Sequence, residues 1–467
     1  MKILVLNCGS SSVKFQFLEM EGEVVLARGL VEKIGSTGAL LRYKRGEAKE
    51  IREETEVPNH EAAINLVLRT LMHSRDGVIA SVDEIDGVGH RVVHGGEAFS
   101  ASVLVDEEVR AAIERCCQFA PLHNPHNLKG IDVCGHLLKG KPQVAAFDTA
   151  FHQTMPPESF LYAIPYGLYR KLGIRRYGFH GTSHKIVAQR AAQELGRPLD
   201  QLRLITCHLG NGSSVAAIRN GRSIDTSMGF TPLEGLMMGT RSGDLDPAVA
   251  PYLMQRERLS AEEVDGLLNK RSGMLGISEA SNDMREIVEG MDAGEERHGL
   301  AFRMFCHRVR KYIGAYAAAL GGIDAVVFTA GIGENSARVR AECLRGLGFL
   351  GIELDEQANL KGAVRISRGP VQALVVPTNE ELAIARDTRE VLGRTVHAAG
   401  ASREEAIDRE LASLDAAARR ELVLLWAADP EAGLERLGQR LSHKLKKRIS
   451  AQALGSELSR LGLRAEP

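Results

Sequence analysis

The chain opens with apolar and polar positions arranged around a short polar turn. The apolar run Ile3–Leu6 stops at Asn7, and a Cys-Gly-Ser-Ser-Ser cluster follows before alternation resumes over residues 13–19. Alternation with a period of two indicates β-strands, and glycine with hydroxyl residues is typical of the turn between them. The pattern predicts a hairpin of strands 3–7 and 13–19. Further strands are expected near 24–28 and 39–43.

Helical and strand patterns then alternate along the chain. Amphipathic or capped segments predict helices over 59–72, 106–120, 123–140 and 183–195, and apolar runs predict strands over 87–93 and 142–151. For the last of these helices, Ser183 is the expected hydroxyl cap, and Gly196 before Pro198 marks its end. Strands that alternate with helices predict an α/β fold.

Residues 202–229 repeat the plan of the first hairpin. An apolar strand leads into a Gly-Asn-Gly-Ser-Ser turn at 210–214, and a returning strand and a third strand follow. Two related hairpins, one in each half, predict duplicated domains that face each other. Two further predicted strands lead into polar sequences, a glycine-rich turn within 325–336 and Thr-Asn-Glu-Glu at 378–381.

These glycine-rich turns fit phosphate binding. Glycine lets the backbone approach an anion closely, and successive N–H groups form an anion-binding concavity. Lys14, just beyond the first turn, would add a point charge. A single such turn is equally well an ordinary β-turn, but the repeated hairpins together favour a polyphosphate site. Residues 135–141 also have Walker spacing, but Pro142 replaces the required hydroxyl residue, so Gly140 is interpreted as a helix C-cap.

Composition narrows the class of protein. A chain of 467 residues is expected to form two domains. The formal net charge of −1 argues against a dedicated nucleic-acid binder. The seven cysteines form no Cys-x-x-Cys pair and are typical of reduced cytosolic thiols. No apolar stretch approaches the ~20 residues of a membrane span. We therefore expect a cytoplasmic protein without nucleic-acid or membrane partners.

Several residues are candidates for chemistry. Arg91 and Arg241 lie in apolar or glycine-rich surroundings, where a buried arginine needs an anionic partner and can grip carboxylate or phosphate with two hydrogen bonds. Asp148 follows a buried strand, and His123 and His180 lie in polar loops. The alternative for each is a structural ion pair or a hydrogen-bonded core histidine.

A zinc site is a competing interpretation. His180 and His184 have the i, i+4 spacing of a zinc-binding helix, and His90 and His94 repeat it. The zinc-hydrolase motif requires Glu where this chain has Gly181, which disfavours zinc.

The motifs taken together resemble the acetokinase family of short-chain acyl kinases, the acetate kinases among them. The resemblance runs from residue 1 to about 393 and is carried by LNCGSSSVKF, GHRVVHGG, FAPLHNP, AFDTAFH, YGFHGTSH, HLGNGSS, DTSMGFTPLEGLMMGTRSGDLDP, FTAGIGENS and PTNEELAIARDT. It implies a duplicated actin-like, ribonuclease H-like ATPase fold with two βββαβαβα domains and a cleft between them. The expected domains are 1–150, completed by a helix near 381–393, and the nucleotide-binding 151–380.

The resemblance also implies a role for each matching residue. Arg91 matches the grip on the substrate carboxylate, Asp148 the active-site acid, and His180 and Arg241 the stabilisers of the transition state. The pocket for the acetate methyl group is matched by Val93, Leu122, Phe179 and Pro232. Nucleotide contacts are matched by Lys14, His208, Leu209, Gly210, Asn211, Gly212, Asp283, Met284, Arg285, Gly331, Ile332, Gly333, Glu334 and Asn335. Asn7 and Glu380 match the magnesium site.

The implied reaction is reversible in-line transfer of the ATP γ-phosphoryl group to acetate, which gives ADP and acetyl phosphate. A carboxylate needs no strong base, so the two arginines, His180 and Mg²⁺ (alternatively Mn²⁺) would neutralise charge, while Asp148 orients Arg91 or a metal-bound water. Propionate is the alternative acceptor. A nucleotide-binding, actin-like ATPase without an acid substrate is the alternative class. The family also implies a homodimer.

The last segment, 394–467, lies beyond the resemblance. Ser402 and Glu405 form a capping-box signal, and apolar residues recur at helical spacing from Leu434 to Ile449. This predicts a small helical extension. The basic stretch 443–448 is most simply a solvated helix face. We interpret the extension as an interaction or regulatory module that phosphoryl transfer does not require.

Overall fold

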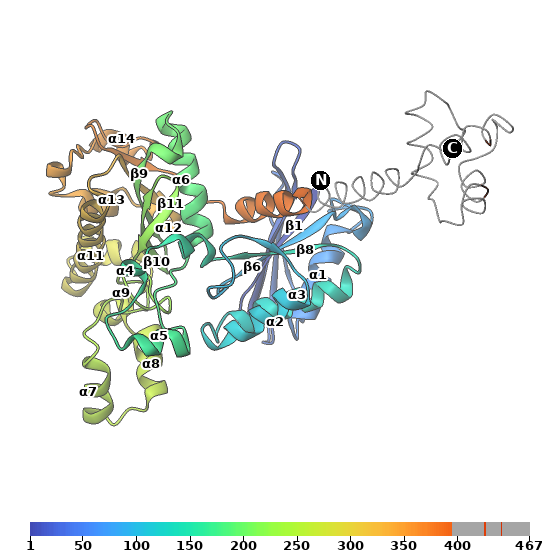
Figure 1. Cartoon of the computed structure of the whole chain (residues 1–467), viewed down its shortest axis with the longest axis horizontal. Helices are drawn as coiled ribbons and strands as arrows, with labels where there is room; N and C mark the ends of the chain where they lie inside the picture. The colour runs from blue at the N-terminus through green and yellow to red at the C-terminus, as the bar shows by residue number, and fades with distance from the viewer. Residues whose placement is uncertain (395–424, 426–439, 441–467) are drawn as a thin grey trace. The chain divides into compact units, whose positions relative to one another are not determined.

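A computed structural model describes residues 1–394, 425 and 440 of the chain. Contacts between residues divide the chain into a unit of residues 1–391 and a second unit, 392–467. The helical extension predicted for 394–467 lies almost entirely outside the described residues. All described strands belong to the first unit and form two mixed sheets (Figure 1).

The first sheet has eight strands in the order β5-β4-β3-β2-β1-β6-β8-β7. Its strands are β1 (Lys2–Cys8), β2 (Ser12–Glu19), β3 (Val24–Glu32), β4 (Leu40–Arg45), β5 (Ile51–Glu54), β6 (Gly87–Val92), β7 (Val103–Leu104) and β8 (Gln143–Phe147). The second sheet has five strands in the order β11-β10-β9-β12-β13. These are β9 (Arg203–Leu209), β10 (Ser213–Arg219), β11 (Arg222–Thr226), β12 (Ala325–Thr329) and β13 (Gln372–Val375).

The two sheets share one topology, which confirms the predicted duplication. In the first sheet β1 pairs antiparallel with β2 and parallel with β6, and β6 pairs parallel with β8. In the second, β9 pairs antiparallel with β10 and parallel with β12, and β12 pairs parallel with β13. The order β3-β2-β1-β6-β8 therefore corresponds to β11-β10-β9-β12-β13. The predicted hairpins are the first two strands of each sheet.

Helices cover both sheets. The α-helices are α1 (His60–Leu71), α2 (Glu107–Arg115), α3 (Asn124–Leu137), α4 (Pro157–Phe160), α5 (Tyr166–Leu172), α6 (Gly181–Leu195), α7 (Val249–Arg256), α8 (Ala261–Lys270), α9 (Gly273–Ser278), α10 (Met284–Asp292), α11 (Glu296–Leu320), α12 (Ala330–Asn335), α13 (Ala337–Leu344) and α14 (Glu356–Leu360). Short 3₁₀ helices span Val82–Glu84, Cys116–Gln118, Ala150–Thr154, Leu199–Gln201 and Gly348–Leu350. Residues 380–394 are also helical.

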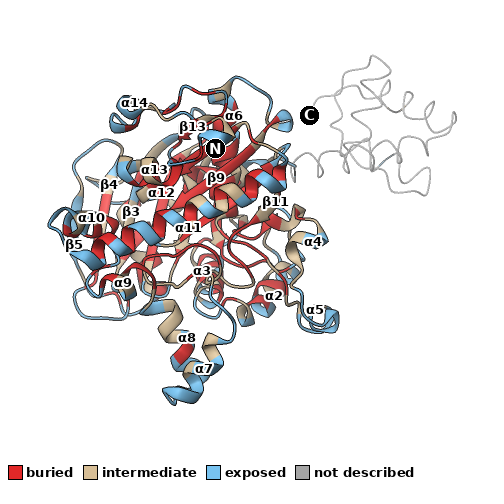
Figure 2. Cartoon of the chain, turned by 90° about the vertical axis from the view of Figure 1, so that its left-hand side faces the viewer, coloured by how far each residue is buried: buried red, intermediate tan, exposed pale blue. Residues whose placement is uncertain are grey.

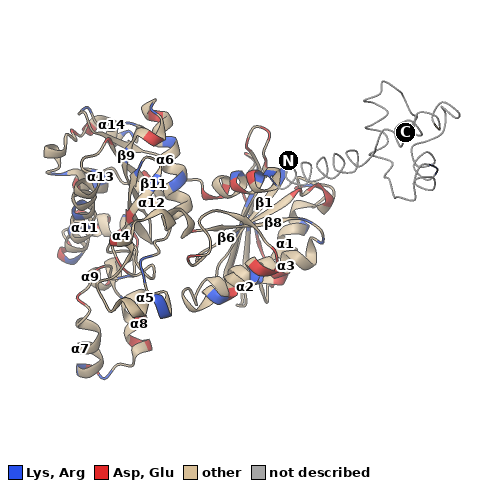
Figure 3. Cartoon of the chain, in the orientation of Figure 1, with Lys and Arg blue, Asp and Glu red and all other residues tan. Residues whose placement is uncertain are grey.

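Because successive side chains of a strand point to opposite faces of its sheet, the two faces pack against different helices. Leu4 and Leu6 of β1 join a core with α1 and α3, whereas Ile3 and Val5 join one with residues 382–385. In the second sheet, one core includes α11 and the other includes α6. The central strands β1, β9 and β12 are therefore buried on both faces, whereas the edge strand β5 is exposed (Figure 2). Charged side chains gather on helices and loops rather than on the central strands (Figure 3).

The structure corrects three predicted details. Helix α6 begins at Gly181 rather than at Ser183, because His180 precedes it in the left-handed conformation with φ of 58°. The expected glycine-rich turn after β12 is the short helix α12. Helix α3 ends at Leu137, so Gly140, with φ of 77°, belongs to the following turn and is not the C-cap. No helix in the described part of the chain is long and apolar enough to span a membrane.

Candidate active site

The parallel strands bring the predicted site residues to one edge of each sheet. Strands β1, β6 and β8 run in the same direction, so Asn7, Val93 and Asp148 lie at or just beyond their carboxyl ends. The 210–212 loop and α12 likewise follow β9 and β12. In open α/β sheets this edge is where ligands bind.

The first predicted phosphate loop is held by side chains from two helices. The backbone N–H of Gly9 donates to the Ser12 carbonyl at 2.8 Å, and the Gly9 carbonyl accepts from His60 Nε2 at 2.7 Å. Asn127 Nδ2 donates to the Cys8 carbonyl at 2.8 Å. These bonds fix the turn.

Asn124 and Asn127 are site-positioning residues that the sequence did not reveal. Asn127 Oδ1 accepts from the N–H of Val93 at 3.1 Å, and Asn124 bonds both the N–H and the carbonyl of His94. Both asparagines are buried at the start of α3. They therefore tie the phosphate loop to the end of β6. The only sequence signal was the pair of asparagines around Pro125 in the first turn of a helix.

Arg91 and Asp148 form a bidentate ion pair. Arg91 Nε and Nη2 donate to the two carboxylate oxygens of Asp148 at 3.0 and 2.6 Å, and Arg91 Nε lies 3.9 Å from Glu380 Oε2. Burial disfavours the charged form of Arg91, but the carboxylates of Asp148 and Glu380 outweigh it, and its pKa is raised. Burial raises the pKa of Glu380, although Arg91 opposes the shift. Lys14 Nζ lies 2.5 Å from Glu381.

Arg241 differs from Arg91 because it has no carboxylate partner among the described residues. Its Nη1 lies 3.4 Å from the Pro232 carbonyl and 3.8 Å from Met238 Sδ. Burial lowers the pKa of the guanidinium. A buried cation without an anion is costly, so the site is suited to an anionic ligand.

His180 lies beside Arg241 at the second predicted phosphate loop. A Cβ on Gly212 would lie 3.6 Å from Arg241 Nη1 and 3.7 Å from His180 Nε2. The His180 ring stacks on His208 with centroids 4.2 Å apart, and its Nδ1 lies 2.9 Å from Ser214 Oγ. Burial, then the neighbouring His208 and Arg91, hold the pKa of His180 well below its usual value. The ring is therefore neutral at neutral pH.

The histidine arrangement speaks against zinc. His184 Nδ1 and Nε2 are both engaged, by Thr206 Oγ1 at 2.7 Å and Ser214 Oγ at 2.8 Å. His90 bonds Gln143, and His94 packs against Tyr177. Among the described residues no three His, Cys, Asp or Glu side chains form a metal-binding group.

More than half of the predicted nucleotide contacts line one cavity of about 660 Å³. Its walls include Gly210, Asn211, Asp283, Met284, Arg285, Gly331, Ile332 and Asn335. Glu334 does not line it. The Glu334 carboxylate instead accepts from the N–H groups of Ala330 at 2.8 Å and Thr378 at 3.0 Å, so it fixes the segment that leads to Glu380.

The predicted methyl pocket is only partly assembled. Val93 and Phe179 are buried in one small apolar cluster with Ala120, Met228 and Met238. Pro232 lies next to it through its contact with Arg241. Leu122, in contrast, is 54% exposed and does not belong to the cluster.

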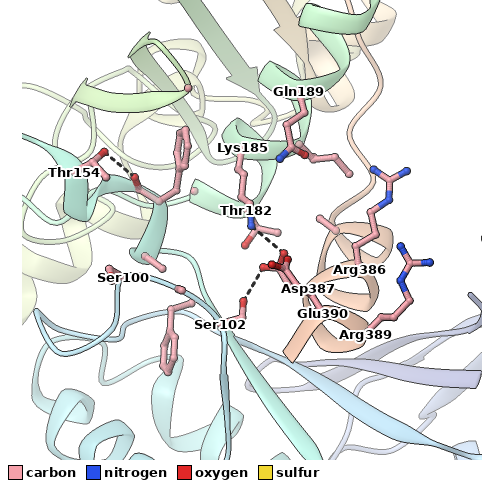
Figure 4. Close-up of a pocket in the computed structure, with 18 residues that line it drawn as sticks. Ser100, Ser102, Thr154, Thr182, Lys185, Gln189, Arg386, Asp387, Arg389 and Glu390 are labelled. Carbon is pink, nitrogen blue, oxygen red and sulfur yellow. Dashed lines mark hydrogen bonds and ion pairs between the residues drawn. The ribbon is translucent and has the colours of Figure 1, made fainter. Parts of the chain in front are cut away.

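A second cavity, of about 620 Å³, lies between α6, the 100–102 loop and the 380–394 helix (Figure 4). Asp387 stands at its centre and accepts from Lys185 Nζ at 2.9 Å and Ser102 Oγ at 2.7 Å. Arg386 binds Glu23, and Arg389 bonds the Met20 carbonyl. These contacts indicate a structural junction behind the candidate active site.

Comparison with known proteins decides the family. The sequence pattern of the acetokinase family matches residues 2–386. The chain belongs to the acetokinase family. It is similar to the acetate kinase of Caldicellulosiruptor saccharolyticus, with 56% identity over 398 residues, which are 84% of this chain and all of that protein. The acetate kinase of Carboxydothermus hydrogenoformans is also 56% identical, over 84% of this chain and 99% of the relative.

Solved structures of an acetate kinase and a propionate kinase also match this chain. The Porphyromonas gingivalis acetate kinase structure aligns with a TM-score of 0.81 at 50% identity, over 84% of this chain and 99% of that one. A Francisella tularensis propionate kinase aligns with a TM-score of 0.79 at 42% identity over the same shares. The expected actin-like fold and the assignment as a phosphotransferase with a carboxyl acceptor are confirmed. The family uses ATP and ADP.

Proposed function

We propose that this protein transfers the γ-phosphoryl group of ATP reversibly to acetate, giving ADP and acetyl phosphate. The observation that carries the proposal is Arg241, a half-buried guanidinium without a carboxylate partner in the described chain, beside His180 and Gly212. Arg91 supplies the second guanidinium, at the apolar cluster of Val93 and Phe179. Two cations and a small apolar surface fit a short carboxylate meeting a phosphate.

Each side chain has a distinct task in this reaction. Arg91 binds the acetate carboxylate, and Asp148 holds the guanidinium plane through its two hydrogen bonds. Acetate is already an anion and attacks the γ-phosphorus directly, so Asp148 is not required as a base. Arg241 and the neutral His180 donate hydrogen bonds to the transferring phosphoryl group, whose oxygens share the developing charge.

The residues around Arg91 also suit magnesium. Asn7 and Glu380 offer an amide and a carboxylate oxygen, which are ligand types that Mg²⁺ uses together with substrate phosphates and water, while Asp148 is held by Arg91. Bound there, the ion would supply charge neutralisation at the β- and γ-phosphates. Manganese would suit the same oxygen set.

Propionate is the alternative acceptor, favoured by the structural likeness to a propionate kinase. The proposed architecture has an N-terminal domain of 1–150, completed by the 381–393 helix, and a nucleotide-binding domain of 151–380. A homodimer remains a prediction from the family.

Hydroxylamine trapping tests the function. The protein is incubated with Mg²⁺, ATP and either acetate, propionate or butyrate, and the acyl hydroxamate is quantified beside released phosphate. We expect hydroxamate with acetate at the highest kcat/KM. Phosphate release without hydroxamate would instead indicate an ATPase without an acid substrate.

A further inference from the structure

We propose that Thr206, His184 and Ser214 form a chain of hydrogen bonds that supports His180 in the tautomer with its proton on Nε2 when a phosphoryl group is bound. These three would be positioning residues for phosphoryl transfer. The proposal rests on the proposed function, because it assumes that His180 donates to the transferring group.

The chain is continuous in space although its members come from three elements. Thr206 Oγ1 of β9 lies 2.7 Å from His184 Nδ1 on α6, and His184 Nε2 lies 2.8 Å from Ser214 Oγ on β10. Ser214 Oγ lies 2.9 Å from Nδ1 of His180, the residue that precedes α6. Thr206, His184 and Ser214 are fully buried. Three hydrogen bonds thus lead from the interior of the second sheet to the candidate active site.

Burial keeps the chain uncharged. It is the main cause that holds the pKa of both His180 and His184 well below the usual range. A neutral imidazole has one donor and one acceptor nitrogen, and a hydroxyl has a single proton to donate. Each member can therefore donate to only one neighbour. If the Ser214 proton is also used within the chain, so that no buried donor is left unpaired, all three bonds point the same way.

Only two arrangements satisfy every member. In the first, Thr206 donates to His184, His184 donates to Ser214, and Ser214 donates to His180 Nδ1, which leaves the proton of His180 on Nε2. In the second, every bond is reversed and Nε2 keeps a bare lone pair. Nε2 faces the phosphate loop, as the 3.7 Å to the Cβ position of Gly212 shows. An anionic phosphoryl group there accepts a hydrogen bond and repels a lone pair, so it selects the first arrangement.

The chain begins at Thr206, and this is the most informative residue to change. Thr206→Val keeps the shape of the side chain but removes the hydroxyl that donates to His184. In the first arrangement His184 Nδ1 then loses its donor, so the tautomer of His180 that the phosphoryl group selects loses the support of the chain. We expect kcat to fall roughly 10- to 100-fold, the range seen when partners that orient a metal-bound histidine are removed. The KM values for acetate and ATP should change less than twofold.

Two variants serve as controls. Thr206→Ser restores the hydroxyl and should recover most of kcat. Thr226→Val removes another fully buried threonine hydroxyl of the same sheet, one that donates to the Val215 carbonyl at 3.1 Å and lies outside the chain. Its kcat should stay within about twofold of the parent. An equal loss in both valine variants would show a general packing effect and overturn the proposal.

A spectroscopic measurement tests the tautomer without any change to the chain. Imidazole ¹⁵N chemical shifts distinguish a protonated nitrogen from a bare one. They would be recorded on the full-length protein with ¹⁵N-histidine, in Mg²⁺, ADP, acetate and aluminium fluoride, which mimics the phosphoryl group. The His180 signals are identified by their loss in His180→Gln. Protonated Nε2 and bare Nδ1 are expected.

The outcomes separate this inference from the proposed function. Protonation of His180 on Nδ1 in that complex, or an unchanged kcat in Thr206→Val, would overturn the hydrogen-bond chain while acetyl phosphate formation by the parent protein stands. Failure of the parent protein to form any acyl phosphate would overturn the proposed function itself.

Discussion

At the scale of single residues, the two arginines differ in what surrounds them, and this difference is testable. Arg91→Ala would leave Asp148 buried without its cation, whereas Arg241→Ala removes a cation that has no carboxylate partner in the described chain. Each change should lower kcat on the order of 10²- to 10³-fold, as for other transition-state donors. Arg91→Ala should also cost on the order of 3 kcal/mol of unfolding free energy, the lower end for a broken buried pair because Arg91 keeps some exposure.

Steady-state kinetics and denaturant unfolding of the two variants check this contrast. Arg241→Ala should be at least as stable as the parent. Near-normal turnover in either folded variant would contradict the two-arginine mechanism, and equal stability losses would contradict the assigned surroundings.

Acceptor size is a second property set by individual side chains. Val93 is 7% exposed and packs in the cluster with Phe179, so Val93→Ala should open room beyond a methyl group. We expect the kcat/KM for propionate, divided by that for acetate, to rise about tenfold. One methylene group in an apolar pocket changes discrimination between two substrates by about this factor or more. Leu122→Ala is the matched control, because Leu122 is exposed and its removal should leave the ratio unchanged. If only Leu122→Ala changed this ratio, Leu122 rather than Val93 would set the size of the acceptor pocket.

At the scale of elements, the sequence predicted what local patterns decide. The hairpins of both sheets were found because alternation and turn residues are local signals. Helices α7 to α11 were not found, since the sequence interpretation assigned no element between the third strand of the repeat and β12. The turn predicted at α12 was wrong for a different reason. The helix is held by Glu334, which bonds Ala330 and the distant Thr378, and no local pattern contains that partner.

The prediction of the candidate site shows the same difference between local sequence signals and contacts with distant partners. Arg91, Asp148, His180 and Arg241 could be predicted because charged and imidazole side chains stand out among apolar or glycine-rich neighbours. Asn124, Asn127 and Ser214 were missed because small polar residues look like caps or turn residues in sequence. Their role depends on backbone groups and rings more than ten residues away in the chain, such as Cys8 and His180.

The helix of residues 380–394 joins the site to the junction shown in Figure 4. It starts with Glu380 and Glu381 beside Arg91 and Lys14, and Asp387 anchors it to Lys185 of α6 and to Ser102. Asp387→Ala should loosen this helix and raise the Mg²⁺ concentration for half-maximal activity several-fold, with a smaller effect on the KM for acetate. Asp292→Asn, which weakens an exposed ion pair with Arg338, is the control. An unchanged Mg²⁺ requirement in Asp387→Ala would show that the junction does not position Glu380.

At the scale of the whole molecule, the chain is longer than the relatives that it matches. The C. saccharolyticus acetate kinase is matched over its full length by 84% of this chain, and the family pattern ends at residue 386. Every residue assigned to the site lies at or before Glu380. Within residues 1–394, the apolar clusters that contain the strands of both sheets include residues up to 385. Neither catalysis nor the core of the first unit is therefore expected to need residues 401–467.

A chain ending at Gly400 tests this directly. We expect it to form acetyl hydroxamate from ATP and acetate with kcat and KM within about twofold of the full-length protein, because no assigned ligand or positioning group is removed. The comparison should be made at equal concentrations of folded protein, with circular dichroism and thermal unfolding to verify the fold. If the folded, soluble truncation forms no acyl phosphate, the extension belongs to the catalytic machinery and its interpretation as a separate interaction module is wrong.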